Sequence, residues 1–247
     1  MIVFIQAVIQ YNAMNIIDIS KQIEFTYPED EHYIYCIPKG IHIAAGKMYS
    51  IQGISGSGKS TLLTLLAALR RFRHGMIQYT FGTKKTIQVT SANWKKTIGP
   101  EFWGNIGFSF QKPELIRALT VKQNLDLAIG KALTEEMALA LFDKKEWESI
   151  KDSKIWKLSG GQTQRLGLIR AFGANQNLVF MDEPTNNLDK SNRQRVVDFI
   201  QKYCHNKSCV FVSHDNSFLD MLDIDTTFEV REESKGQRRS QRILQPR

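Results

Sequence analysis

The chain has 247 residues, of which 42% are hydrophobic and 23% are charged, and it contains only 6 prolines. This is the composition of an ordinary folded cytosolic protein, and the length suffices for one large α/β domain or two small ones. No apolar run approaches the roughly 20 residues that span a bilayer. The three cysteines lack the spacing of a zinc site, so a reducing compartment is the default expectation.

The two ends of the chain are expected to lie outside the main domain, which spans residues 14–230. Residues 1–13 are apolar but lack the basic start of a signal peptide, so they are an N-terminal extension or reflect an upstream start. Part of the net charge of +8 lies in residues 231–247. We expect this basic segment to be a flexible C-terminal tail, the alternative being a contact with anionic lipid, nucleic acid or an acidic partner.

The first third of the chain alternates apolar and polar residues in short runs. Residues 23–27, 34–36 and 41–43 therefore predict half-buried strands separated by turns. A further strand over residues 48–51 leads into a loop rich in glycine and serine, and a helix follows over residues 59–69. This order predicts an antiparallel β subdomain at the start of an α/β domain.

The second half predicts a helical insert followed by a parallel crossover. Residues 112–157 read as mostly helical, and a further helix begins after Gly160 and Gly161. Apolar runs at 178–181 and 209–212 flank an amphipathic helix that starts at Ser191. Continuous apolar runs are typical of strands that are covered on both faces. The expected core is a doubly wound parallel sheet.

One loop carries the pattern of a phosphate-binding site. It follows the strand at 48–51 and precedes the helix that begins at Lys59. Glycines let successive N–H groups point inward, the helix adds its positive end, the lysine reaches the outer phosphates, and the next hydroxyl can bind Mg²⁺. The predicted ligands are Gly53, Ser55, Gly56, Ser57, Gly58, Lys59, Ser60 and Thr61. The loop alone would also fit a kinase, a GTPase or a helicase.

Two carboxylates end the apolar run at 178–181. In open α/β sheets the ligand binds at the carboxyl ends of the strands, so Asp182 is placed to hold Mg²⁺. Glu183 could align and polarise an attacking water. The alternative is that the pair is an acidic strand end that caps a helix.

The segment Leu158–Gln162, which reads LSGGQ, makes the chain resemble the ABC ATPase family over about residues 15–230. The resemblance implies a P-loop NTPase core of the RecA-like type, with an N-terminal antiparallel β subdomain and an inserted helical subdomain at about 112–157. It rests on several motifs in order: FTYP with Tyr27, the phosphate loop at 53–61, FSFQKP with Gln111, LSGGQTQR at 158–165, LVFMDEP at 178–184, NNLD at 186–189, and FVSHD with His214.

The resemblance implies ATP and Mg²⁺ as cofactors and two copies of the chain arranged head to tail. A serine before two glycines at a helix start can present a hydroxyl and N–H groups to an anion. Each ATP would then lie between one copy's phosphate loop and the other copy's Ser159, Gly160, Gly161 and Gln162.

The resemblance also assigns single residues. Tyr27 would stack on adenine, and Gln111 would sense Mg²⁺ and the γ-phosphate. Asp189 would face the partner copy across the interface. His214 would bond the γ-phosphate and position Glu183. The predicted catalytic residues are therefore Glu183, His214 and Gln111, and the predicted metal ligands are Ser60, Gln111 and Asp182.

Within the family, the chain looks similar to the lipoprotein-release, macrolide-efflux and cell-division branch, although Asn186 stands where that branch has glycine. This implies an ATPase subunit on the cytoplasmic face of the cell membrane, bound to a separate transmembrane permease and touching the membrane only through it. The coupling surface is expected near Leu115, Ile116 and Leu119, which alternatively pack the insert's own core. The other hypotheses are a soluble ABC protein that acts on ribosomes or nucleic acid, which is disfavoured by the single module, and a regulatory subunit with negligible turnover.

Overall fold

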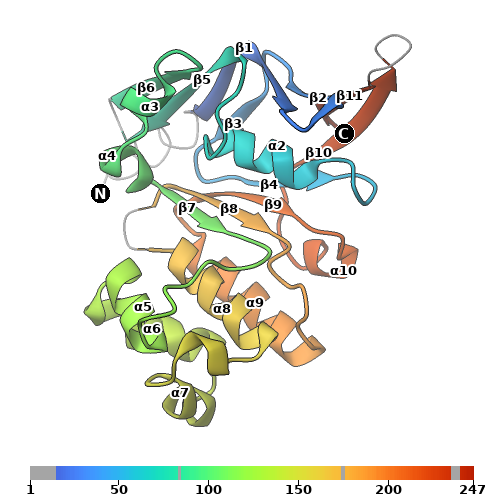
Figure 1. Ribbon diagram of the computed structural model, residues 1–247. Coiled ribbons are helices and arrows are strands. Elements are labelled where there is room, and N and C mark those ends of the chain that lie inside the picture. Colours follow the sequence, from blue (N-terminus) through green and yellow to red (C-terminus); the bar gives the residue numbers. More distant parts are fainter. Residues whose placement is uncertain (1–14, 83–84, 174–175, 235–239) are drawn as a thin grey trace, which may run out of the picture.

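The computed structural model describes residues 15–82, 85–173, 176–234 and 240–247. Its strands form one curled sheet in the order β6-β5-β1-β2-β11-β10-β4-β9-β8-β7, with β3 paired to β1 (Figure 1). The strands are β1 (Asn15–Tyr27), β2 (Asp30–Ile37), β3 (His42–Ala44), β4 (Met48–Gln52), β5 (His74–Phe81), β6 (Lys85–Thr90), β7 (Ile106–Ser109), β8 (Leu178–Asp182), β9 (Ser208–Val212), β10 (Thr226–Ser234) and β11 (Ser240–Pro246). The helices are α2 (Lys59–Leu66), α3 (Trp94–Thr97), α4 (Pro100–Trp103), α5 (Val121–Ile129), α6 (Lys131–Leu141), α7 (Lys144–Ile150), α8 (Gly160–Ala171), α9 (Lys190–Tyr203) and α10 (Asn216–Leu219), with a 3₁₀ turn at Ile155–Lys157.

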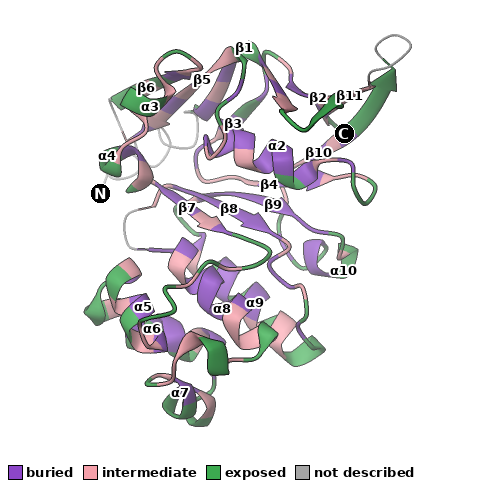
Figure 2. Cartoon of the chain, in the orientation of Figure 1, coloured by how far each residue is buried: buried purple, intermediate pink, exposed green. Residues whose placement is uncertain are grey.

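The half of the sheet that carries the predicted site is parallel and covered on both faces. Strands β7, β8, β9, β4 and β10 pair in parallel, with α2 on one side and α8 and α9 on the other (Figure 1). Alternate residues of β8 enter different cores: Leu178 packs in the cluster that contains α2, and Val179 in the cluster that contains α8 and α9. All residues of β8 and β9 are buried (Figure 2), which explains their unbroken apolar runs.

The other half of the sheet is antiparallel. Strand β1 pairs with β2, β3 and β5, and β5 pairs with β6. In β1 the buried residues Ile17, Ile19 and Ile23 follow the alternation seen in the sequence. The resulting mixed sheet with helices on both faces is the expected α/β class.

The helical insert begins later than the sequence suggested. Residues 111–119, all described, form no helix, and α5 starts after Thr120, whose side chain makes a capping box with Gln123. The buried side chain of Asn124 accepts from Ile116 N at 2.8 Å and donates to Ile116 O at 3.1 Å. Because a side chain satisfies these backbone groups, the segment needs no helix, and the helical spacing read there was wrong.

The described residues of the C-terminal segment, 231–234 and 240–247, belong to strands or directly follow one, contrary to the flexible tail predicted for residues 231–247. Strand β11 pairs antiparallel with β10 and parallel with β2, between the two halves of the sheet (Figure 1). Leu244 is fully buried in the sheet's core. β11 contains one basic residue, Arg242, beside the apolar Ile243 and Leu244, so the net charge of the segment did not indicate a mobile tail. The extension predicted at residues 1–13 lies outside the described residues.

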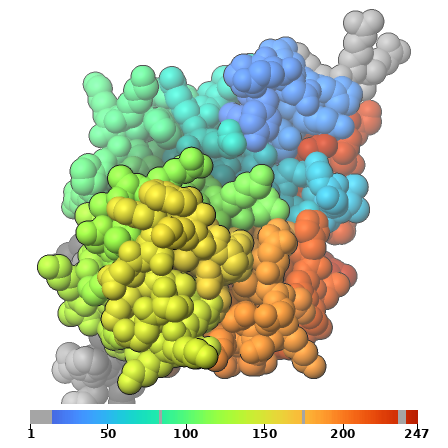
Figure 3. Space-filling view, turned by 60° about the horizontal axis from the view of Figure 1, so that its bottom comes forward, coloured from blue at the N-terminus to red at the C-terminus, as the bar shows by residue number. Residues whose placement is uncertain are grey.

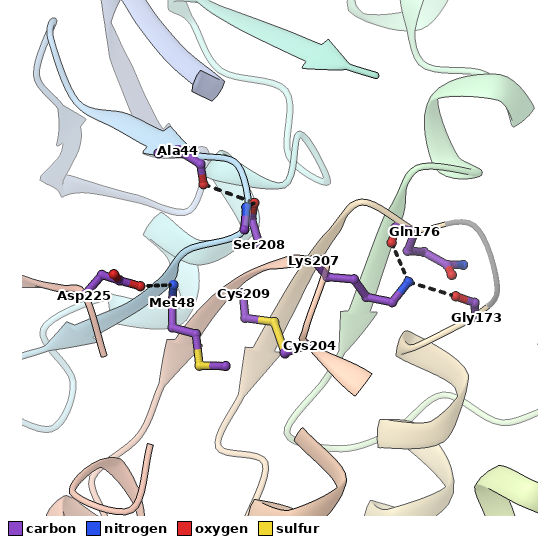
Figure 4. Close-up of a disulfide and its surroundings, with 10 residues drawn as sticks. Ala44, Met48, Gly173, Gln176, Cys204, Lys207, Ser208, Cys209 and Asp225 are labelled. Carbon is purple, nitrogen blue, oxygen red and sulfur yellow. Dashed lines mark hydrogen bonds between the residues drawn. A yellow bond between two sulfur atoms is a disulfide. The ribbon is translucent and has the colours of Figure 1, made fainter. Parts of the chain in front are cut away.

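A disulfide joins Cys204, at the end of α9, to Cys209 in β9 (Figure 4). The sequence offered no pairing for the cysteines, so this bond was missed. Between the two cysteines, Lys207 donates to Gln176 O at 2.6 Å, and Ser208 Oγ donates to Ala44 O at 3.1 Å. The six-residue loop therefore ties α9 to two other segments of the core.

Candidate functional site

The predicted phosphate loop opens onto a pocket of about 350 Å³ at the carboxyl ends of β8 and β9. This is the edge at which doubly wound sheets bind ligands. Ten of the residues singled out in the sequence line it, together with three that the sequence reasoning missed. The lining residues are Tyr27, Tyr35, Ser55, Gly56, Gly58, Lys59, Ser60, Thr61, Gln111, Glu183, Val212, His214 and Arg242.

The loop needs its glycines. Gly56 and Gly58 have φ values of 75° and 91°, which residues with a Cβ rarely adopt. At Gly58 a Cβ would also lie 2.2 Å from Cε1 of Tyr35, because that ring packs directly on the backbone. Glycine is therefore required at Gly56 because of its positive φ, and at Gly58 because of both its positive φ and the contact with Tyr35. Helix α2 begins at the next residue.

Lys59 is held inside the loop. It is 5% exposed, and its Nζ donates to the carbonyl oxygens of Gly53 at 3.0 Å and Ile54 at 2.9 Å. Burial lowers the pKa of this ammonium, while the carboxylates of Glu183 and Asp182 act in the opposite direction. A phosphate group could replace the carbonyl oxygens as acceptor.

Ser60 and Asp182 meet at the end of β8. Ser60 Oγ donates to Asp182 Oδ1 at 3.0 Å. Burial raises the pKa of Asp182, against the bond from Ser60 and the charge of Lys59. A hydroxyl and a carboxylate beside a phosphate loop are the hard oxygen ligands that Mg²⁺ takes together with substrate phosphates, so the pair fits the metal expected from the sequence.

Glu183 is fixed on the pocket wall from several directions. Its backbone has a φ of 50°, and its amide donates to Val212 O at 2.8 Å in the neighbouring strand. His214 N donates to Glu183 Oε2 at 3.2 Å, and His214 Nε2 lies 3.2 Å from Oε1. Burial raises the pKa of Glu183, so a proton acceptor of increased basicity stands beside the phosphate loop.

A second hollow of about 350 Å³ adjoins the first and shares three of its residues. Gln111, Glu183 and His214 line both. The second hollow is otherwise lined by Thr185, Asn186, Asn187, Leu188, Arg193 and Asp215. Asp189 lies just beyond it as the N-cap of α9, where its carboxylate accepts from Asn192 N at 2.8 Å. The bond from the Asn192 amide is the main reason why the pKa of Asp189 is lowered.

The predicted Ser159–Gln162 segment lies apart from the phosphate loop. None of its four residues lines either hollow in the described part of the chain. In the space-filling view, the region of this segment (yellow) and that of the phosphate loop (cyan) occupy separate parts of one face (Figure 3). Ser159 is the N-cap of α8: its Oγ accepts from Gln162 N at 3.2 Å, and the Gln162 side chain accepts from Ser159 N at 3.0 Å.

A buried ion pair, missed in the sequence, holds this helix to α7. Both guanidinium nitrogens of Arg165 bond the carboxylate of Glu146, at 2.6 and 2.9 Å, and Gln162 Nε2 donates to the same group at 3.0 Å. The Arg165 side chain is 4% exposed and lies over the ring of Phe142. The charged stretch near Glu146 gave the only sequence signal, and it resembled a solvated helix face.

The aromatic residue predicted to stack on a base lies at the pocket wall with two residues that the sequence did not indicate. Tyr27 Oη is 3.0 Å from Thr61 Oγ1 of α2. The Tyr35 and Tyr27 rings have centroids 5.6 Å apart, and Arg242 donates to Tyr35 Oη at 3.2 Å. The sequence could not place Arg242 here, since its position depends on pairing between β11 and β2.

Sequence comparison matches residues 40–186 to the family model described as ABC transporter. The macrolide export ATP-binding/permease protein MacB of Mannheimia succiniciproducens is 31% identical over 211 residues, which are 83% of this chain and 32% of that protein. The lipoprotein-releasing system ATP-binding protein LolD of Aquifex aeolicus is 34% identical over 195 residues, 76% of this chain and 84% of that protein. This chain thus spans about a third of the length of the macrolide export protein.

Among solved structures, the ATP-binding cassette MJ0796 superimposes with a TM-score of 0.67 at 25% identity, covering 86% of this chain and 93% of that one. The structure is described as dimeric, in a post-hydrolysis state bound to ADP and Pi. The MJ0796 protein of Methanocaldococcus jannaschii is 31% identical over 207 residues. The phosphate loop, the strand-end carboxylates and these likenesses agree, and the chain belongs to the ABC transporter family as one of its ATP-binding cassettes, a family of ATPases.

Proposed function

We propose that this chain is the ATP-hydrolysing subunit of a transporter, and that two copies enclose two Mg-ATP head to tail. The observation that carries the proposal is the separation of two anion-binding features in one chain. Lys59 and Ser60 line one pocket and Ser60 bonds Asp182, whereas the start of α8 opens elsewhere on the surface. A second copy supplies what one chain lacks.

The residues of the pocket have distinct tasks. Lys59 binds the outer phosphates, and His214 holds Glu183 and bonds the γ-phosphate. Glu183 accepts a proton from the attacking water, for which its raised pKa suits it. Ser60 and Asp182 would hold Mg²⁺, with Gln111 at the pocket's edge; when bound, the ion neutralises phosphate charge.

The start of α8 forms the other half of the site. Its N–H groups and helix dipole favour an anion. The space beside the Gly160 Cα is open, with nothing within 4 Å of where a Cβ would lie, so a partner can approach closely. The dimeric structure of MJ0796 with ADP and Pi supports two such cassettes meeting around nucleotide.

The membrane partner would dock beside α5. A groove of about 330 Å³ there is lined by Phe108, Phe110, Pro113 and Arg170, among others. Of the three residues predicted for this surface, Ile116 is 42% exposed, whereas Leu115 packs on the helical core. Across the described ranges of the chain, no helix has the length and apolarity needed to cross a bilayer. The name of the macrolide relative, an ATP-binding/permease protein, supports a permease partner, and we place the chain with that partner at the cytoplasmic face of the membrane.

Two experiments test this proposal. Purified protein should release phosphate from Mg-ATP, and Lys59→Ala should abolish the release; absent turnover in the wild type would favour a regulatory subunit. Affinity capture from detergent-solubilised cells should retrieve a membrane-spanning protein, and Ile116→Asp should reduce its recovery while leaving hydrolysis unchanged. Recovery of ribosomes or nucleic acid instead would contradict the transport assignment.

A further inference from the structure

The C-terminal strand contributes a cation to the pocket. Arg242 of β11 pairs in parallel register with Tyr35 of β2, so both side chains project from the same face of the sheet, and both line the pocket. Across the antiparallel pair, Arg242 faces Glu232 of β10. The guanidinium thus reaches the nucleotide pocket through the pairing of strands that are distant in sequence.

The Arg242 side chain is largely buried but incompletely paired. It is 11% exposed, and its guanidinium carbon lies 3.6 Å from the centroid of the Tyr33 ring. Its Nε lies 3.7 Å from Glu232 Oε2, and among the described residues this nitrogen has no hydrogen-bond partner. A buried guanidinium nitrogen without a hydrogen bond is unfavourable, so a further acceptor would be bound strongly here.

The position of Tyr35 indicates which part of a nucleotide this acceptor belongs to. The Tyr35 ring touches the phosphate loop at Gly58, and its hydroxyl contacts Arg242. Tyr35 therefore contacts both the phosphate loop and Arg242. Tyr27, proposed to stack on the base, meets the Tyr35 ring edge to face.

We propose that Arg242 is a nucleotide-binding residue whose guanidinium donates to acceptor atoms of the base and ribose. This inference rests on the proposed ATP binding and adds a contact outside the phosphate loop. Base and ribose are common to ATP and ADP, so the contact contributes equally to the affinity for both. It does not touch the reacting phosphate, and turnover at saturating ATP is independent of it.

The test is nucleotide titration of the full-length chain with ATP and with ADP. Arg242→Ala should weaken both by the same factor of about ten, as expected for a charge-assisted hydrogen bond, while kcat stays within about twofold. Arg242→Lys should restore only part of the affinity, because an ammonium lacks the planar fork. Arg231→Ala is the matched control, since Arg231 is an exposed arginine of the neighbouring strand β10, and it should change nothing.

A second variant distinguishes loss of the guanidinium from loss of its packing against Tyr33. Tyr33→Leu removes the ring under the guanidinium but no lining residue of the pocket. If Tyr33→Leu keeps its affinity while Arg242→Ala and Arg242→Gln lose theirs, the guanidinium itself binds. Equal affinity of Arg242→Ala and wild type, or a loss for ATP without a loss for ADP, would overturn the inference. If the wild type bound no nucleotide at all, the proposed function would fail instead.

Discussion

The phosphate loop and the start of α8 use the same helix-terminus chemistry but are built differently. In the first, Lys59 and Ser60 at the start of α2 line a pocket, and Asp182 at the end of β8 accepts a hydrogen bond from Ser60. In the second, Ser159 and Gln162 satisfy each other's backbone at an exposed helix end. The comparison teaches that similar helix starts can serve in a pocket built from distant strands or at an exposed end whose backbone groups its own side chains satisfy.

Glu183→Gln should give the largest effect, and it acts on the first region alone. The amide keeps the bond from His214 N but cannot accept a proton, so phosphate release should fall by about a hundredfold or more. ATP affinity should be kept, as measured by titration with Mg-ATP. A variant that retained a tenth of wild-type activity would require another proton acceptor.

Glu146→Ala tests whether the second region depends on its buried ion pair. Removing the carboxylate leaves the Arg165 guanidinium buried without its partner, which should cost about 3 kcal/mol of unfolding free energy. Glu148→Ala on the same helix removes only an exposed pair and should cost less than about 1 kcal/mol. ADP binding should be unchanged in Glu146→Ala, whereas ATP hydrolysis should fall. Loss of ADP binding would mean that the two regions are not independent.

Cys204→Ser tests how much the Cys204–Cys209 disulfide stabilises the fold that carries both regions. The disulfide closes a loop of six residues, so its loss should lower the unfolding free energy by about 2 kcal/mol without changing kcat. Reductant should give wild type the same loss in a denaturation series. The intact mass of unreduced protein should be lower by two hydrogens than the mass of the reduced protein. Equal masses would mean that both cysteines are free thiols.

Asp182→Asn tests whether the buried charge of Asp182 lowers the stability of the fold, and it should have the smallest effect on stability. Burial raises the pKa of Asp182 in the folded state above its ordinary value of 3.8, so over the pH range between these two values the folded state holds the proton more tightly than the unfolded chain. As pH rises through this window, the unfolded chain ionises first and native stability falls. The variant should therefore unfold at a slightly higher temperature than wild type at neutral pH, and the difference should vanish below pH 3.8. A lower melting temperature at neutral pH would show that the charge is not a cost, and the exposed Asp152→Asn serves as control.

The sequence predicted those parts of the fold that depend on local patterns. The apolar runs located β8 and β9, the glycines located the phosphate loop, and the serine before two glycines located the start of α8. The sequence failed to predict the parts of the fold that depend on pairing between strands far apart in the chain. Arginines in 231–247 resembled a mobile tail, yet β11 pairs with β2 about 200 residues earlier in the chain, and this pairing also brings Arg242 into the pocket.

The half-site is tested most directly by the mass of the Glu183→Gln protein in solution with and without Mg-ATP, measured by light scattering. It should be monomeric without nucleotide and dimeric with it. Adding Gly160→Asp places a carboxylate where the partner's phosphate would lie; the site has room for the side chain, and aspartate suits a helix start. The double variant should bind ATP with unchanged affinity and stay monomeric. An ATP-dependent dimer that survives Gly160→Asp would contradict the account.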